Sequence, residues 1–265
     1  NAVVVAAGCD VQAQGEKADD CIDIIIGNNK KKDIAQILEE YFAAKEPEQE
    51  VPVVSEVIDI NHTKEYEDLT IHKVNEHTRA YIKIQDGCNQ FCSYCIIPYT
   101  RGRIRSKNPE EVIEEVKNLA AQGYKEIVLT GIHLSSYGKD LGTVTLLDVI
   151  KRIQQVEDVE RIRLGSLEPR IITEEFVKEL VKCDKVCPHF HLSLQSGCDE
   201  TLKRMNRKYT TEEYEEALNI LRKYYEHPAL TTDVIAGFVG ETEEEFEKAR
   251  AYGEGNERYE LHIFE

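Results

Sequence analysis

The sequence contains no apolar run close to the roughly 20 residues that a membrane-spanning helix needs. Its apolar start has no basic segment before it, so it does not read as a secretory signal peptide. Positive charge is also scarce, because 33 Lys and Arg residues stand against 50 Asp and Glu residues, giving a formal net charge of −17. This balance argues against generic binding to the nucleic-acid backbone. We therefore predict a cytoplasmic protein with no membrane partner.

The 265 residues, of which 41% are apolar and 31% charged, suffice for one large domain or two modest ones. Residues 3–7 and 22–26 read as buried strands, and apolar residues at helical spacing predict a helix over about 30–44. Residues 45–78 are polar and irregular, which is typical of an interdomain linker with room for one short strand. We predict a small α/β domain with its linker over 1–65 and a second domain over 66–265.

Beyond the linker, predicted strands and helices alternate. Asn108 is expected to cap the first helix, and acidic first turns mark later helix starts at Thr173, Thr211 and Thr242. The strands are expected at 81–85, 126–130, 161–165, 190–194, 232–238 and 260–264. Such alternation predicts a parallel sheet with helices outside it. Six strands are too few for a closed eightfold barrel, so the predicted fold is α/β with a partial (β/α)6 barrel.

Three of the eight cysteines form the strongest chemical signal. Cys88, Cys92 and Cys95 have CxxxCxxC spacing in the loop after the first predicted barrel strand. Three thiolates on one tight loop can hold three irons of a 4Fe–4S cluster and leave the fourth iron open to a small molecule. A zinc knuckle is the alternative, but residues 96–99 offer no fourth ligand.

This loop resembles that of the radical-SAM superfamily, and the string from Cys88 to Ser106 is similar to the methylthiotransferases within it. The bacterial group that acts on N6-threonylcarbamoyladenosine in tRNA is the most similar. Further similar stretches are 129–138, 163–169, 189–206 and 232–242, so the resemblance covers about residues 75–265. Residues 8–29 resemble the end of the family's N-terminal methylthiotransferase α/β domain, which places that domain before the radical-SAM barrel.

The resemblance implies an enzyme that transfers a methylthio group to C2 of N6-threonylcarbamoyladenosine at position 37 of tRNA. One S-adenosylmethionine (SAM) would bind the open iron and be cleaved with an electron from a donor such as flavodoxin or ferredoxin. A second SAM would methylate sulfur at an auxiliary 4Fe–4S cluster. Close alternatives perform the same chemistry on isopentenyladenosine in tRNA or on an aspartate of a ribosomal protein.

The similar stretches fall at the carboxyl ends of predicted strands, where barrel enzymes place their sites. Contacts to SAM are therefore expected from strand-end residues and from Tyr94 in the cysteine loop. The expected strand-end residues are Gly131, Ser166, Glu168, Gln195, Asp233 and Gly237. Taken singly, each of them reads equally well as a polar strand-end cap or a turn glycine.

The remaining cysteines have weaker signals. Cys9 matches one of three cysteines that hold the auxiliary cluster in the family, and its two partners are expected upstream of this sequence. Without the resemblance, Cys9 reads as a structural thiol. Cys183 and Cys187 lie near two histidines, but packing explains them better than a second metal site.

One basic stretch interrupts the acidic composition, because Arg101, Arg103, Arg105 and Lys107 follow the cysteine loop. Beside an active site, these residues suit an anionic substrate such as the anticodon loop of tRNA. Alternatively, they pair with acidic residues in a solvated turn. The family's tRNA-binding TRAM domain is expected beyond residue 265. A reading of a different class is a non-enzymatic, zinc-stabilised RNA-binding module, in which the strand-end residues have no role.

Overall fold

The computed structural model describes residues 2–14, 19, 21–44, 53–69, 78–255 and 260–264. The chain divides into two compact units. The first unit comprises residues 1–69, 86–89 and 95–105, and the second comprises 70–85, 90–94 and 106–265. The predicted domain boundary between residues 65 and 66 stays a prediction, because segments beside the cysteine loop also group with the first unit.

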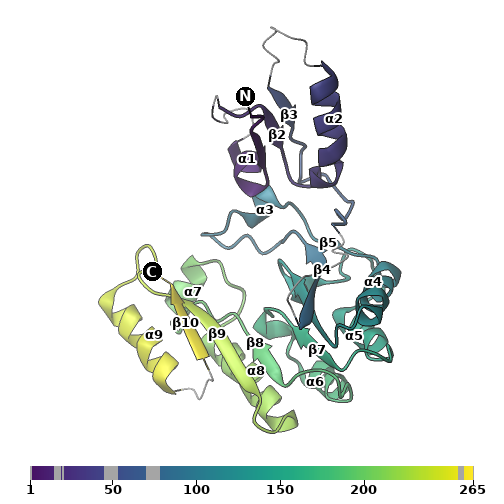
Figure 1. Ribbon diagram of the computed structural model, residues 1–265. Coiled ribbons are helices and arrows are strands. Elements are labelled where there is room, and N and C mark those ends of the chain that lie inside the picture. Colours follow the sequence, from purple (N-terminus) through teal and green to yellow (C-terminus); the bar gives the residue numbers. More distant parts are fainter. Residues whose placement is uncertain are drawn as a thin grey trace. The chain divides into compact units, whose positions relative to one another are not determined.

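The first unit contains a three-stranded parallel sheet in the order β1-β2-β3. Its first elements are β1 (Val5–Ala7), α1 (Cys9–Gln14), β2 (Ile24–Ile26), the 3-10 turn η2 (Lys31–Asp33), α2 (Ile34–Ala44) and β3 (Val54–Glu56). Ile24 and Ile26 of the central strand pack against Ile37 and Tyr41 of α2, which lies alongside the sheet (Figure 1). The strands and helix predicted before residue 45 are confirmed, and β3 is the short strand for which the linker had room. Residues 45–52 and 70–77 of the predicted linker lie outside the described ranges.

The second unit contains sheets in the orders β5-β4-β6-β7 and β8-β9-β10 (Figure 1). Their strands are β4 (Arg79–Asp86), β5 (Arg105–Ser106), β6 (Glu126–Gly131), β7 (Arg161–Leu164), β8 (His189–His191), β9 (Ala229–Ile235) and β10 (Glu260–Phe264). Isolated parallel bridges, Ile162 with Val186 and Leu167 with Leu192, continue the ladder from the β7 side to the β8 side. With β5 set aside, the strands follow one another in chain order as parallel neighbours. The predicted partial (β/α)6 barrel is confirmed.

Helices connect successive strands of this barrel. They are α4 (Pro109–Ala121), α5 (Leu146–Ile153), α6 (Glu174–Leu180), α7 (Asp199–Arg204), α8 (Thr211–Tyr224) and α9 (Glu243–Gly255), with 3-10 turns η3 (Leu134–Ser136) and η4 (Pro169–Ile171). The Asn108 side chain accepts a hydrogen bond from the Glu110 N–H at 2.8 Å, which confirms the predicted cap. Thr210, one residue before the predicted start, caps α8 in a capping box with Glu213. In the described ranges, no helix combines the length and apolar character that crossing a bilayer requires.

Two predicted strands end differently in the structure. β8 stops at His191 rather than Leu194, because the chain beyond it joins the sheet only through isolated bridges. Gln195 has a φ of +68°, which ends the extended conformation there. β9 ends at Ile235 instead of continuing to residue 238, and Gly237 turns the chain with a φ of +71°.

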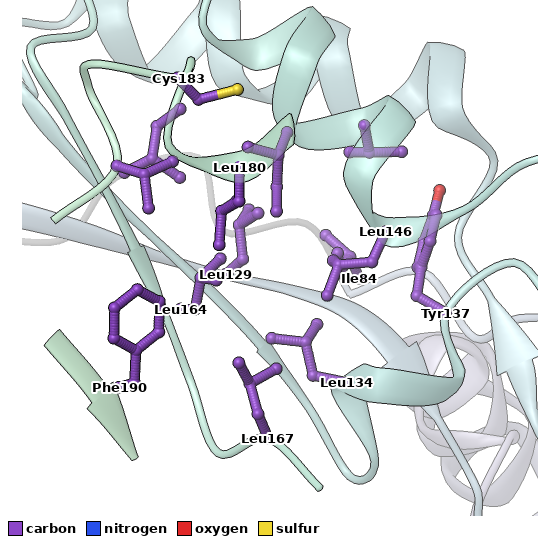
Figure 2. Close-up of a cluster of buried hydrophobic side chains, with 14 of the residues drawn as sticks. Ile84, Leu129, Leu134, Tyr137, Leu146, Leu164, Leu167, Leu180, Cys183 and Phe190 are labelled. Atoms are coloured by element: carbon purple, nitrogen blue, oxygen red, sulfur yellow. The ribbon is translucent and has the colours of Figure 1, made fainter. Parts of the chain in front are cut away.

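The core of the second unit lies between the barrel strands and the helices. Figure 2 shows Ile84, Leu129, Leu164 and Phe190 of four barrel strands in one cluster with Leu180 of α6, and none of these side chains is more than 2% exposed. Because side chains alternate along a strand, the intervening residues project from the opposite face of the sheet. They include Lys83, Thr130, Arg163, His191 and Asp233. The barrel thus has an apolar face toward its helices and a polar face that suits a ligand.

Candidate cluster and cofactor site

The cysteines with CxxxCxxC spacing lie in the loop between β4 and α3 (Ile97–Thr100). Cys88 is buried, and its backbone N–H donates to the Gly102 carbonyl at 3.0 Å. The preceding Gly87 has a φ of +70°, and a Cβ atom at this position would lie 1.9 Å from the Arg103 carbonyl oxygen. The start of the loop therefore requires glycine at position 87.

Cys92 has a cationic neighbour that the sequence analysis missed. The Arg207 Nη1 atom donates to Cys92 Sγ at 3.3 Å, and Arg207 Nε donates to the Tyr209 hydroxyl at 3.0 Å. Burial alone would lower the pKa of Arg207, but the electrostatic effects of Tyr209, Tyr94 and Cys92 are larger together. The pKa of Arg207 is therefore raised above its ordinary value. Arg207 directly follows residues 189–206, one of the stretches that are similar to the methylthiotransferases. A single arginine in a chain with so many charged residues is not a motif, so nothing in the sequence indicated this role.

The middle of the cysteine loop is held by the segment that follows α7. Ser93 donates through its backbone N–H to the Met205 carbonyl at 3.1 Å and through Oγ to the Arg204 carbonyl at 2.8 Å. Asn206 Nδ2 donates to the Phe91 carbonyl at 2.7 Å. Phe91 and Asn206 both have positive φ values, +54° and +59°, so each side of this contact is a tight turn. These bonds fix the residues on both sides of Cys92.

The donor set suits an iron–sulfur cluster. Three thiols lie on one irregular loop, and a guanidinium already contacts one of them. Within the described ranges, no three His, Cys, Asp or Glu side chains are grouped closely enough to hold a metal ion. A structural zinc site, which closes with four protein ligands, fits this loop less well.

Three of the predicted SAM contacts meet at the carboxyl ends of β8 and β9. The Tyr94 hydroxyl donates to Gln195 Oε1 at 2.9 Å, and the Tyr94 ring packs edge-on against Phe238 with centroids 6.0 Å apart. The backbone N–H of Gln195 donates to the Asp233 carbonyl at 2.9 Å. The Asp233 carboxylate lies 3.1 Å from the nearest ring nitrogen of His191 and 3.2 Å from that of His262. Tyr94, Gln195 and Asp233 thus belong to one connected group of polar side chains and backbone.

Ser166 and Gly131 lie at neighbouring strand ends. Ser166 is exposed, and its Oγ atom is 3.0 Å from the Oγ atom of Ser193. A Cβ atom at Gly131 would lie 2.9 Å from the Cβ of Gln85 on β4. The missing side chain at position 131 therefore makes room for Gln85. No hydrogen bond among the described residues joins Gly131, Ser166 and Glu168 to one another.

Glu168 and His133 form a buried polar pair at the same edge of the barrel. The Glu168 carboxylate contacts the Arg170 guanidinium and lies 3.9 Å from His133 Nε2. His133 Nδ1 lies 2.7 Å from Ser136 Oγ. Burial lowers the pKa of His133 to about 4, and the Glu168 charge only partly offsets it. The Arg170 guanidinium compensates the charge of the Glu168 carboxylate. Gly237, the last predicted contact, is exposed and donates its N–H to Glu241 Oε2 at 2.7 Å.

Residues 82–252 match the radical SAM superfamily. The chain belongs to this superfamily. The cobalamin-dependent S-adenosylmethionine radical enzyme OxsB matches 94% of this chain and 39% of its own, with a TM-score of 0.67 at 12% identity. The radical S-adenosylmethionine methyltransferase TsrM from Kitasatospora setae matches 70% of this chain and 35% of its own, with a TM-score of 0.58 at 19% identity. At these identities the likeness shows a shared radical SAM fold.

Sequence relatives confirm the resemblance to tRNA methylthiotransferases. The threonylcarbamoyladenosine tRNA methylthiotransferase MtaB of Bacillus subtilis (strain 168) is 39% identical over 265 residues, which are 99% of this chain and 57% of that protein. MtaB of Aquifex aeolicus (strain VF5) is 38% identical over 99% of this chain and 63% of its own. The tRNA-2-methylthio-N(6)-dimethylallyladenosine synthase of Clostridium botulinum (strain Hall) is 38% identical over 94% of this chain and 55% of its own. The chain thus spans somewhat more than half the length of these relatives.

Cys9, at the start of α1, has polar neighbours that favour its thiolate. Asn28 Nδ2 lies 3.5 Å and Arg101 Nε 3.1 Å from Cys9 Sγ, and both donate to it. Burial raises the pKa of Cys9, but the hydrogen bonds and the Arg101 charge outweigh it, so the pKa is lowered overall. A thiol of this kind is suited to metal or cluster ligation rather than to packing.

Most charged side chains of the basic stretch after the cysteine loop form ion pairs within the protein. Arg105 is 1% exposed and lies 3.9 Å from the Asp86 carboxylate, which is also 3.6 Å from Arg101. Lys107 is 2% exposed, with Nζ 2.8 Å from Glu115 Oε2. The prediction that Arg105 and Lys107 contact RNA is therefore wrong, because neither charge reaches solvent. Arg103 is the exposed member of the stretch.

The other cysteines of the second unit are structural in character. Burial raises the pKa values of Cys183, Cys187 and Cys198, and this effect is the largest cause at each of them. Cys183 lies in the core cluster (Figure 2). Packing thus accounts for Cys183, as predicted.

Proposed function

We propose that this chain is the catalytic core of a radical SAM methylthiotransferase that modifies C2 of N6-threonylcarbamoyladenosine at position 37 of tRNA. The observation that carries the proposal is 38–39% identity to two threonylcarbamoyladenosine tRNA methylthiotransferases along 99% of the chain. The cysteine loop at the carboxyl end of β4 supplies the chemistry that such a reaction needs.

Cys88, Cys92 and Cys95 would hold the radical SAM 4Fe–4S cluster. When bound, this cluster supplies the electron that cleaves SAM, drawn from a donor of the flavodoxin or ferredoxin class. Tyr94 and Gln195 hold one another in place beside the loop and orient the polar groups of SAM. The Tyr94 ring also packs edge-on against Phe238 beside this position.

The other strand-end residues have roles of different kinds. The exposed Ser166 hydroxyl can turn from Ser193 to a ligand. The Asp233 carboxylate contacts two imidazoles, which hold it in one orientation and suit it to a ligand hydroxyl. The edge of the site is shaped by Glu168, which Arg170 holds in place, and by the glycines Gly131 and Gly237.

Cys9 would contribute one ligand to an auxiliary 4Fe–4S cluster. Its thiolate is favoured by Asn28 and Arg101, which donate directly to Cys9 Sγ. The resemblance to the methylthiotransferases implies two further cysteine ligands for this cluster. Arg101 therefore serves the sulfur site, and Arg103 is the residue of the basic stretch that we assign to tRNA contact. Action on tRNA places the protein in the cytoplasm.

A specific observation also favours dimethylallyladenosine as the substrate, because a synthase for its 2-methylthio derivative is 38% identical over 94% of this chain. The test incubates the anaerobically reconstituted protein with dithionite, SAM and tRNA that carries either adenosine. We expect 2-methylthio-N6-threonylcarbamoyladenosine as the product. Methylthiolation of the dimethylallyl substrate alone would reject the threonylcarbamoyl assignment. A colourless protein that holds zinc instead of iron would reject the enzyme class.

A further inference from the structure

Arg207 differs from most other described arginines in the partners of its guanidinium. Arg163 pairs with Glu126, and Arg204 pairs with Glu245. Among the described residues, no carboxylate forms an ion pair with Arg207. Its polar partners are the Tyr209 hydroxyl and Cys92 Sγ, and its guanidinium lies 4.9 Å from the Tyr209 ring centroid.

A partly buried guanidinium without a carboxylate is costly, because desolvation of the charge is not repaid by an anion. A neutral thiol is a weak hydrogen-bond acceptor and repays little of this cost. A thiolate that ligates an iron–sulfur cluster carries negative charge and is a good partner for a fixed cation. The surroundings of Arg207 therefore fit a cluster-bound Cys92 better than a free thiol.

Arg207 also has a fixed position relative to the loop. Its neighbour Asn206 donates to the Phe91 carbonyl, and Met205 accepts from the Ser93 N–H. Tyr209, the other partner of Arg207, donates to the Leu194 carbonyl at 2.9 Å in the segment that follows β8. The guanidinium is thus anchored to the barrel through Tyr209 and to the loop through its backbone neighbours.

We propose that Arg207 is a positioning residue that holds the Cys92 ligand and raises the reduction potential of the radical SAM cluster. The inference rests on the proposed function, since it requires a cluster at Cys88, Cys92 and Cys95. Reduction adds one electron, and so one negative charge, to the cluster. A cation that contacts a ligand sulfur stabilises the reduced state more than the oxidised state, because hydrogen bonds and charge near the sulfurs set the potential.

The test measures the midpoint potential of the reconstituted protein by EPR during titration with dithionite. In Arg207→Gln, we expect the equilibrium constant for reduction to fall at least tenfold, which is a shift of about 59 mV to more negative potential for one electron. Arg207→Lys keeps the charge and should stay within about 59 mV of the wild-type potential. Arg204→Gln is the matched control, because it removes the same charge from the same segment, where the guanidinium binds Glu245 instead. Its potential should equal that of the wild type.

An unchanged potential in Arg207→Gln, or an equal shift in Arg204→Gln, would overturn the inference. If Arg207→Gln retains no cluster, its potential cannot be measured, and the iron contents of Arg207→Gln and Arg207→Lys are compared instead. The inference then requires Arg207→Lys to bind about four irons, and equal loss of iron from both variants would refute a role for the charge. A wild-type protein that binds no iron–sulfur cluster would refute the proposed function itself. A wild-type cluster with an unshifted variant refutes only the role of Arg207.

Discussion

The buried ion pair between Lys107 and Glu115 gives a sharp test of the structure. Lys107 Nζ lies 2.8 Å from Glu115 Oε2, and the two side chains are 2% and 8% exposed. Lys107→Met removes the cation and leaves the Glu115 carboxylate buried without a partner. Breaking a buried pair in this way costs about 3–5 kcal/mol of unfolding free energy.

Two further variants separate the charge effect from packing. Lys107→Met combined with Glu115→Leu removes both charges, and apolar replacement of a buried pair is often neutral or stabilising. We therefore expect the double variant to recover most of the stability that the single variant loses. Lys125→Met is the exposed control, because Lys125 pairs with Asp158 at 3.3 Å with both side chains well exposed. An exposed pair contributes no more than about 1 kcal/mol.

Urea unfolding at neutral pH, followed by circular dichroism, measures the four proteins. A loss below about 1 kcal/mol in Lys107→Met, or a double variant as unstable as the single one, would refute the burial of this pair. If Lys107 instead contacted RNA, Lys107→Met would weaken tRNA binding without changing the unfolding free energy. That outcome would restore the prediction that the structure has overturned.

Three further predictions concern the loop, the pH dependence and the core. Gly87→Ala should abolish iron loading, because its Cβ would overlap the Arg103 carbonyl, whereas Gly123→Ala, with φ +96° and nothing within 4 Å, should load normally and lose only about 1–2 kcal/mol. The pKa of His133, about 4 against an ordinary 6.5, means that the unfolded chain binds more protons, so stability should fall by about 3 kcal/mol as the pH drops from 6.5 toward 4. His133→Gln should flatten that fall in unfolding experiments, and an unchanged profile would contradict the assignment. Phe190→Ala should cost about 3–5 kcal/mol in urea unfolding, and a loss under 1 kcal/mol would contradict the packing of this fully buried ring.

The order of barrel elements could be predicted from the sequence because strand and helix periods differ clearly. Asn108 and Thr173 marked helix starts through local hydrogen bonds, which depend only on nearby residues. The ends of β8 and β9 could not be predicted. They depend on pairing with strands distant in sequence and on the positive φ of Gln195 and Gly237.

The cysteine loop was visible in the sequence, but the partners of its side chains were not. Arg207 is 115 residues from Cys92, and only the fold brings them together. The prediction that Lys107 contacts RNA was wrong for a different reason. Lys107 pairs with Glu115 of α4, which follows it by 8 residues. The local charge pattern does not reveal whether a lysine faces solvent or a buried carboxylate. Sequence spacing thus predicted the ligands, and the tertiary structure shows which side chains contact them.

The most direct test of the central claim measures SAM cleavage by the anaerobically reconstituted protein with dithionite. We expect about four irons at the cysteine loop and formation of 5′-deoxyadenosine. A variant that combines Cys88→Ala, Cys92→Ala and Cys95→Ala should produce none, while Cys183→Ala, a buried cysteine outside the loop, should cleave SAM normally. Cleavage by the triple variant would contradict the assignment of the cluster to this loop.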